Sequence, residues 1–79
     1  MQDKFIELFK ETLEIEDREL QMTDIFRNYE EWNSLAYLSV IAMIDEEYEV
    51  VIEGVAFKQL QTLEELYNGI QKRIRVDTI

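Results

Sequence analysis

Apolar side chains recur along the chain at the spacing of one face of an α-helix in three separate stretches. The first stretch covers about residues 2–13 and carries Phe5, Leu8, Phe9, Thr12 and Leu13 on one face. The second covers about residues 34–48, with an inner stripe of Leu38, Ile41, Ile44 and Tyr48 and with Leu35 at its edge. The third begins at Thr62 and carries Leu63, Leu66, Tyr67, Ile70 and Ile74. The pattern predicts three long amphipathic helices.

The two later helices also have start signals in the sequence. Asn33 or Ser34 supplies the capping side chain of the second helix, because both types accept hydrogen bonds from free backbone N–H groups. Thr62 and Glu65 have the spacing of a capping box, in which each side chain bonds the other residue's backbone. These signals predict helix starts at about residues 34 and 63.

The segments between the helices carry polar residues with scattered apolar anchors. Residues 15–33 form a long connection, and we expect a short turn near residues 23–27. Residues 50–52 read as an extended connection, and residues 55–61 as a short helix. The fold class is therefore all-α: a small bundle of three long helices plus one short helix, with a long loop between the first and second helices. Residues 1–79 form a single domain, with a frayed C-terminus at about residues 77–79.

Charge and composition narrow the function. The 79 residues include 18 acids and 8 bases, for a net charge of −10, and they contain neither histidine nor cysteine. Such a chain repels the phosphates of nucleic acids and anionic membrane surfaces, so basic protein partners are expected instead. The missing histidine and cysteine disfavour an enzyme or a metal site. The absence of cysteine is compatible with a reducing cytoplasm, which is the default expectation.

One hydroxyl stands out against this background. Ser34 lies at the start of a predicted helix, where free backbone N–H groups favour an anionic substituent such as a phosphate ester. The same helix ends in the acidic run Asp45, Glu46 and Glu47, which favours a basic partner. From the residues alone, a plain capping serine remains the alternative. The combination is what a serine modified by a basic enzyme would need.

The residues around Ser34 resemble a known family. Residues 32–35, Trp-Asn-Ser-Leu, resemble the Asp-Ser-Leu attachment motif of acyl carrier proteins, with Asn33 where the family usually has Asp. The resemblance continues through the acidic, aromatic end of the helix at residues 45–48 and the apolar residues 50–52. Residues 57–63 resemble the family's short third helix and the threonine that opens the fourth. In all, the resemblance covers about residues 24–70.

The resemblance implies a carrier that catalyses nothing itself. A 4′-phosphopantetheine arm on Ser34 would carry acyl intermediates as thioesters between enzymes of a lipid, polyketide or related pathway, fatty acid biosynthesis included. The implied partners are a phosphopantetheinyl transferase and basic acyl-transferring enzymes, and the protein would act as a monomer. The implied recognition surface consists of Asn33, Leu35, Leu38, Ala42, Met43, Asp45, Glu46 and Glu47. A peptidyl or aminoacyl carrier, or an acidic interaction module without a prosthetic group, remains an alternative.

Overall fold

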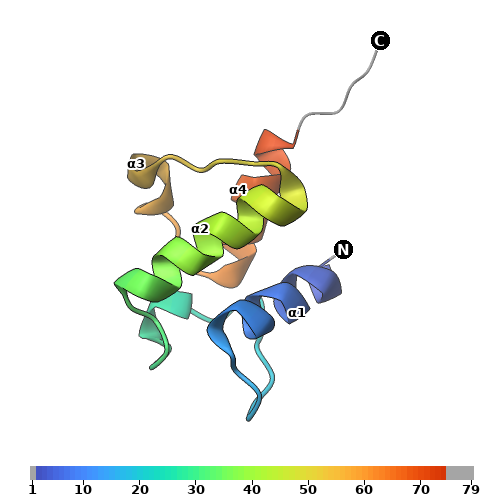
Figure 1. Ribbon diagram of the computed structural model, residues 1–79, viewed down its shortest axis with the longest axis vertical. Helices are drawn as coiled ribbons and strands as arrows, with labels where there is room; N and C mark the ends of the chain where they lie inside the picture. The colour runs from blue at the N-terminus through green and yellow to red at the C-terminus, as the bar shows by residue number, and fades with distance from the viewer. Residues whose placement is uncertain (1, 75–79) are drawn as a thin grey trace.

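Helices are the regular elements of residues 2–74, the part of the chain that the structure, a computed structural model, describes (Figure 1). In chain order they are α1 (Gln2–Leu13), the 3-10 helix η1 (Phe26–Asn28), α2 (Ser34–Tyr48), α3 (Gly54–Phe57) and α4 (Leu63–Arg73). The predicted class, three long helices and one short one with a long first loop, is confirmed. The frayed end expected at residues 77–79 lies outside the described residues.

The core forms where α1 and α2 pack side by side over α4 (Figure 1). Phe5 and Phe9 of α1 are fully buried, as the helical spacing predicted. The buried residues of α2 are Ala36, Val40, Met43 and Ile44. Within residues 2–74, no helix combines the length and the apolar character that crossing a membrane requires.

The inner stripe predicted for α2 is right at Ile44, which is buried, and at Ile41 and Tyr48, which pack against the core, but it is wrong at Leu38. Leu35 and Leu38 face outward, with 72% and 61% of their surface exposed. The buried residues instead follow the series Ala36, Val40 and Ile44, four positions apart. The physical reason is that α2 carries apolar side chains on nearly every side, so its periodicity does not select one face.

The long loop is fastened to the start of α4 by backbone hydrogen bonds. The N–H of Leu63 donates to the carbonyl of Asp24 at 3.1 Å, and the N–H of Glu64 donates to that of Met22 at 2.9 Å. In the other direction, the N–H of Phe26 donates to the carbonyl of Gln61 at 3.2 Å. The first free N–H groups of α4 are thus paired with the loop. The turn expected near residues 23–27 is present, because the N–H of Asp24 donates to the carbonyl of Gln21 at 2.9 Å and η1 follows directly.

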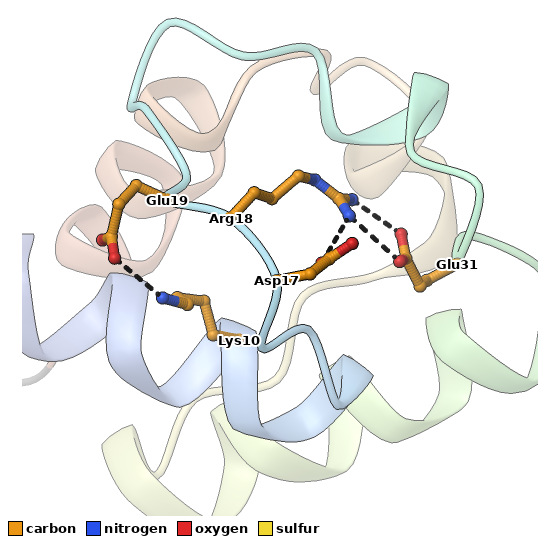
Figure 2. Close-up of polar contacts among 5 residues, drawn as sticks. All are labelled: Lys10, Asp17, Arg18, Glu19 and Glu31. Carbon is orange, nitrogen blue, oxygen red and sulfur yellow. Dashed lines mark hydrogen bonds and ion pairs between the residues drawn. The ribbon is translucent and has the colours of Figure 1, made fainter.

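An ion-pair group joins the beginning of the same loop to its end, as Figure 2 shows. Arg18 donates to both oxygens of the Glu31 carboxylate, with the shorter contact from Nη2 to Oε1 at 2.7 Å. It also contacts Asp17 at 3.2 Å, and its guanidinium lies 5.3 Å from the centre of the Tyr29 ring. The hydrogen bonds from Arg18 hold the pKa of the Glu31 carboxyl below its ordinary value.

Side chains form hydrogen bonds with the backbone at the start of α4 and at the end of α3. Thr62 and Glu65 form the predicted capping box at the start of α4. Arg27 holds the end of α3, donating from Nη2 to the Phe57 carbonyl at 2.6 Å and from Nε to the Leu60 carbonyl at 2.9 Å. The short helix occupies Gly54–Phe57 and so begins and ends earlier than the predicted residues 55–61.

Candidate functional site

The site starts at the junction between the loop and α2. Asn33 is the capping residue, and its Oδ1 accepts a hydrogen bond from the Ala36 N–H at 2.7 Å. Ser34 is the first residue of α2 and is exposed. The structure thus decides between the two capping candidates that the sequence offered. Because Asn33 makes the cap, the Ser34 hydroxyl takes no part in it and remains exposed.

Ser34 opens onto a groove of about 420 Å³. Residues of η1, the loop, α2 and α3 line it: Arg27, Trp32, Asn33, Ser34, Tyr37, Gly54, Phe57 and Lys58. Its charged lining residues are the cations Arg27 and Lys58, although the chain as a whole carries a net charge of −10. A helix N-terminus adds partial positive charge at the same place. The groove therefore suits a phosphate ester on Ser34, with an apolar wall for the atoms that follow it.

The predicted recognition residues divide into exposed and buried ones. Leu35, Leu38 and Ala42 are exposed along α2 and form a continuous apolar face beside Ser34. Met43 is only 8% exposed and packs in the core, so it offers a partner little surface. The reason is geometric, since one residue along a helix turns about 100°, enough to carry Met43 from the Ala42 face to the core.

Two further apolar residues are exposed in the segment that follows α2. Val51 is 68% exposed and Val55, in α3, is 77% exposed. Sequence reasoning missed both. A signal existed for Val51, because Val50 and Ile52 on either side are buried and extended chain alternates its side chains. The one-turn helix α3 gave no comparable signal for Val55.

The acidic residues lie at the far end of α2 from Ser34. Asp45, Glu46 and Glu47 are all exposed in the last turns, as predicted. Glu49 ends the helix in a left-handed conformation, with φ of 56°, and its N–H donates to the Asp45 carbonyl at 2.9 Å. Negative charge at a helix C-terminus opposes the helix dipole. These three acids therefore destabilise the isolated helix. Their exposed carboxylates are accessible to a cationic partner.

Comparisons with known proteins bear on this arrangement. The family model described as the phosphopantetheine attachment site matches residues 3–70. The solution NMR structure of a holo acyl carrier protein from Geobacter metallireducens is similar in fold, with a TM-score of 0.78. That match covers 90% of this chain and 82% of the other at 15% sequence identity. A search of curated proteins found no significant match.

Proposed function

This chain belongs to the phosphopantetheine attachment-site family, and on that premise we propose that Ser34 is the residue that bears the arm. The cofactor of the family is covalently attached 4′-phosphopantetheine, and the protein is a carrier rather than an enzyme. The thiol at the end of the attached arm holds an acyl group as a thioester. Family membership also argues against an acidic module without a prosthetic group.

The observation that carries the proposal is the setting of the Ser34 hydroxyl. It is exposed at the first position of α2, next to a capping residue that does not need it, and it borders the groove with Arg27 and Lys58. In the transfer, Ser34 Oγ attacks the phosphorus next to the pantetheine in coenzyme A. An O–P bond forms and the pyrophosphate bond breaks, releasing the adenosine bisphosphate part. The hydroxyl proton passes to a base of the transferase.

The face beside Ser34 supports a partner role for α2. We propose that Leu35, Leu38 and Ala42 supply the apolar contact, while Asp45, Glu46 and Glu47 attract basic acyl-transferring enzymes. Long-range attraction of this kind accelerates encounter more than it strengthens binding. A shuttle needs that combination because it must also leave each enzyme. Asn33 lies where a modifying transferase would approach Ser34.

The experiment is intact-mass measurement after incubation with coenzyme A and a broad-specificity phosphopantetheinyl transferase. The wild type is expected to gain one phosphopantetheine, and Ser34→Ala none. Ser39→Ala is the matched control, because Ser39 is the other serine of the chain, in the same helix but partly buried. It is expected to load fully. Circular dichroism should show Ser34→Ala as helical as the wild type. Loading of Ser34→Ala would overturn the assignment.

The proposal also covers the cargo, the cellular compartment and the oligomeric state. The protein is proposed to serve a lipid, polyketide or related pathway as a cytoplasmic monomer, with a peptidyl or aminoacyl carrier as the alternative cargo class. Loading the wild type with a panel of acyl and aminoacyl pantetheines and offering each to candidate enzymes separates these classes. Gel filtration of the loaded protein tests the monomer.

A further inference from the structure

Four aromatic rings fill the part of the core that lies behind Ser34. We call Phe9, Phe26, Trp32 and Phe57 the aromatic stack. Trp32 lies nearly parallel to Phe9 and to Phe57, with ring centres 6.3 and 6.1 Å apart and interplanar angles of 6° and 3°. Phe26 meets Trp32 edge-on at 4.9 Å. Phe9, Phe26 and Phe57 are fully buried or nearly so. The stack thus joins α1, η1 and α3 through the loop that precedes α2.

The outer side of the stack is also the inner wall of the groove at Ser34. Trp32 and Phe57 belong to both, and Tyr37 covers Phe57 edge-on at 4.9 Å between ring centres. A group attached to Ser34 therefore meets these rings before it can reach the interior of the bundle. Space for it inside would open only if Trp32 or Phe57 left the stack, because closely packed rings leave no room between them.

Arg27 makes such a movement unfavourable. Its guanidinium holds the backbone of α3 through the carbonyls of Phe57 and Leu60. It also lies over the Phe26 and Phe57 rings, 5.2 and 5.4 Å from their centres. Displacing Phe57 would break these hydrogen bonds and cation–π contacts together with the ring stacking. Arg27 therefore holds Phe57, and with it the wall of the groove, through both backbone hydrogen bonds and contacts with the aromatic rings.

We propose that the aromatic stack keeps the cargo outside the helical bundle, with Phe57 and Trp32 as the residues that exclude it. The inference rests on the proposed attachment at Ser34 and deepens it by naming the cargo class. A long alkyl chain held outside can lie against the apolar wall of the groove on one side only, and the rest of its surface remains in water, which is unfavourable. Short acyl groups and polar groups, aminoacyl groups included, do not need burial. The stack therefore fits this carrier to short or polar cargo that stays accessible to partner enzymes.

The test compares the wild type carrying an acetyl arm with the wild type carrying an octanoyl arm, each installed from its coenzyme A ester. A buried octanoyl chain would raise the melting temperature by at least about 4 °C, since about 1 kcal/mol has that effect in a domain of this size. We expect a difference below about 2 °C and an unchanged emission spectrum of Trp32, the single tryptophan. A clear rise, or a shift of the Trp32 emission with chain length, would overturn the proposal.

Phe57→Ala tests the role of the ring itself. Removing it opens space behind the groove, so the octanoyl form should become more stable than the acetyl form in this variant. Phe5→Ala is the matched control, because Phe5 is equally buried but does not line the groove. There the two forms should have equal stability. Equal stability in Phe57→Ala as well would overturn the assignment to Phe57, and the wild-type comparison decides the proposal if Phe57→Ala does not fold.

Failure of the proposed attachment at Ser34 gives a different experimental result from failure of the inference about the aromatic stack. If Ser34 is not the attachment residue, intact mass shows no arm on the wild type or shows one on Ser34→Ala. If the arm is on Ser34 and the octanoyl chain nevertheless stabilises the wild type, only the inference about the aromatic stack fails.

Discussion

Asn33 and Ser34 are neighbours at the start of α2, and only Asn33 caps the helix. The sequence narrowed the cap to these two residues, and composition alone could not choose between them because both types cap helices well. The structure assigns the cap to Asn33 through its contact with the Ala36 N–H. The resemblance around residues 32–35 pointed to Ser34 as the modified residue, and that assignment stays a prediction until loading is measured.

The cap and the transferase contact can be separated at position 33. Asn33→Ala removes the capping oxygen and should destabilise the fold by about 1 kcal/mol. Asn33→Asp keeps that oxygen and adds a charge that the helix N-terminus favours, so stability should be retained. Because a carboxylate can also pair with a cation of the transferase, Asn33→Asp should load faster than the wild type. Urea unfolding and the initial rate of loading measure the two effects. A loss of stability in Asn33→Asp equal to that in Asn33→Ala would contradict the capping role.

The stability that Glu31 contributes to the fold depends on pH. Its carboxyl has a lowered pKa because Arg18 donates hydrogen bonds to the charged form. A lowered folded pKa means that the unfolded chain takes up the proton first as the pH falls. The stability contributed by this pair is therefore present above the ordinary pKa of 4.5 and is lost as the pH falls through the lower folded pKa.

Glu31→Gln should consequently be less stable than the wild type at neutral pH, and the difference should shrink on acidification. Urea unfolding at about pH 7 and at about pH 3 measures it. Glu30→Gln is the control, because Glu30 is the exposed neighbour of Glu31 and the structure shows Arg18 bonded to Glu31. A difference that is the same at both pH values would rule out the ion pair as its source.

At the scale of the elements, the ends of the helices were more predictable than their faces. The predicted bounds of α1 and α2 agree with the structure, and the capping box of α4 was visible in Thr62 and Glu65. Local hydrogen bonding determines these features, so a short window of sequence contains them. The inward face of α2 depends on what packs against it. Leu38 and Val40 are both apolar, and the positions of the neighbouring elements decide which one is buried.

Gly69 is a local weakness in α4 that the fold does not require. Close packing against a neighbour would be one reason for a glycine inside a helix. In the structure, a Cβ at this position would lie 3.5 Å from Leu60 Cδ1, which is ordinary van der Waals contact. Gly69→Ala should therefore stabilise the protein by about 0.5–1 kcal/mol through helix propensity.

Chemical denaturation of Gly69→Ala measures that gain. Gly54→Ala serves as the comparison, because Gly54 is the first residue of α3 rather than the interior of a long helix. It should change stability less. Destabilisation by Gly69→Ala would mean that Leu60 cannot accommodate the added methyl group.

At the scale of the whole molecule, the charge is uneven. The chain carries −10, the acids Asp45, Glu46 and Glu47 are crowded at one end of α2, and cations line the groove at the other end. Crowded like charges raise the free energy of the folded state. The proposed attraction of basic enzymes would give a reason for this crowding, because a surface of like charges that attracts a cationic partner repels itself when the partner is absent.

Salt should relieve that repulsion. Raising the ionic strength from about 0.1 M to about 1 M shortens the screening length from about 10 Å to about 3 Å. The melting temperature is expected to rise by a few degrees with sodium chloride, and with magnesium at lower concentration. The double variant Glu46→Gln, Glu47→Gln should begin with a higher melting temperature and respond less. Glu16→Gln, a change at an exposed acid in the loop, is the control. A melting temperature independent of both salts would contradict the idea.

The hydrogen bonds between the long loop and the start of α4 also constrain the order in which the chain assembles. Leu63 and Glu64 donate to the carbonyls of residues 24 and 22, which precede α2 in the chain. The loop therefore cannot be completed until the last helix has been made and has docked. Synthesis from the N-terminus leaves α1 and α2 with an unfinished connection until the C-terminal residues emerge. Once they dock, the loop and α4 belong to one cooperative unit, which would open and close together. Trp32 and Ser34 follow that loop directly, so we expect the geometry around Ser34 to be complete only after α4 has docked.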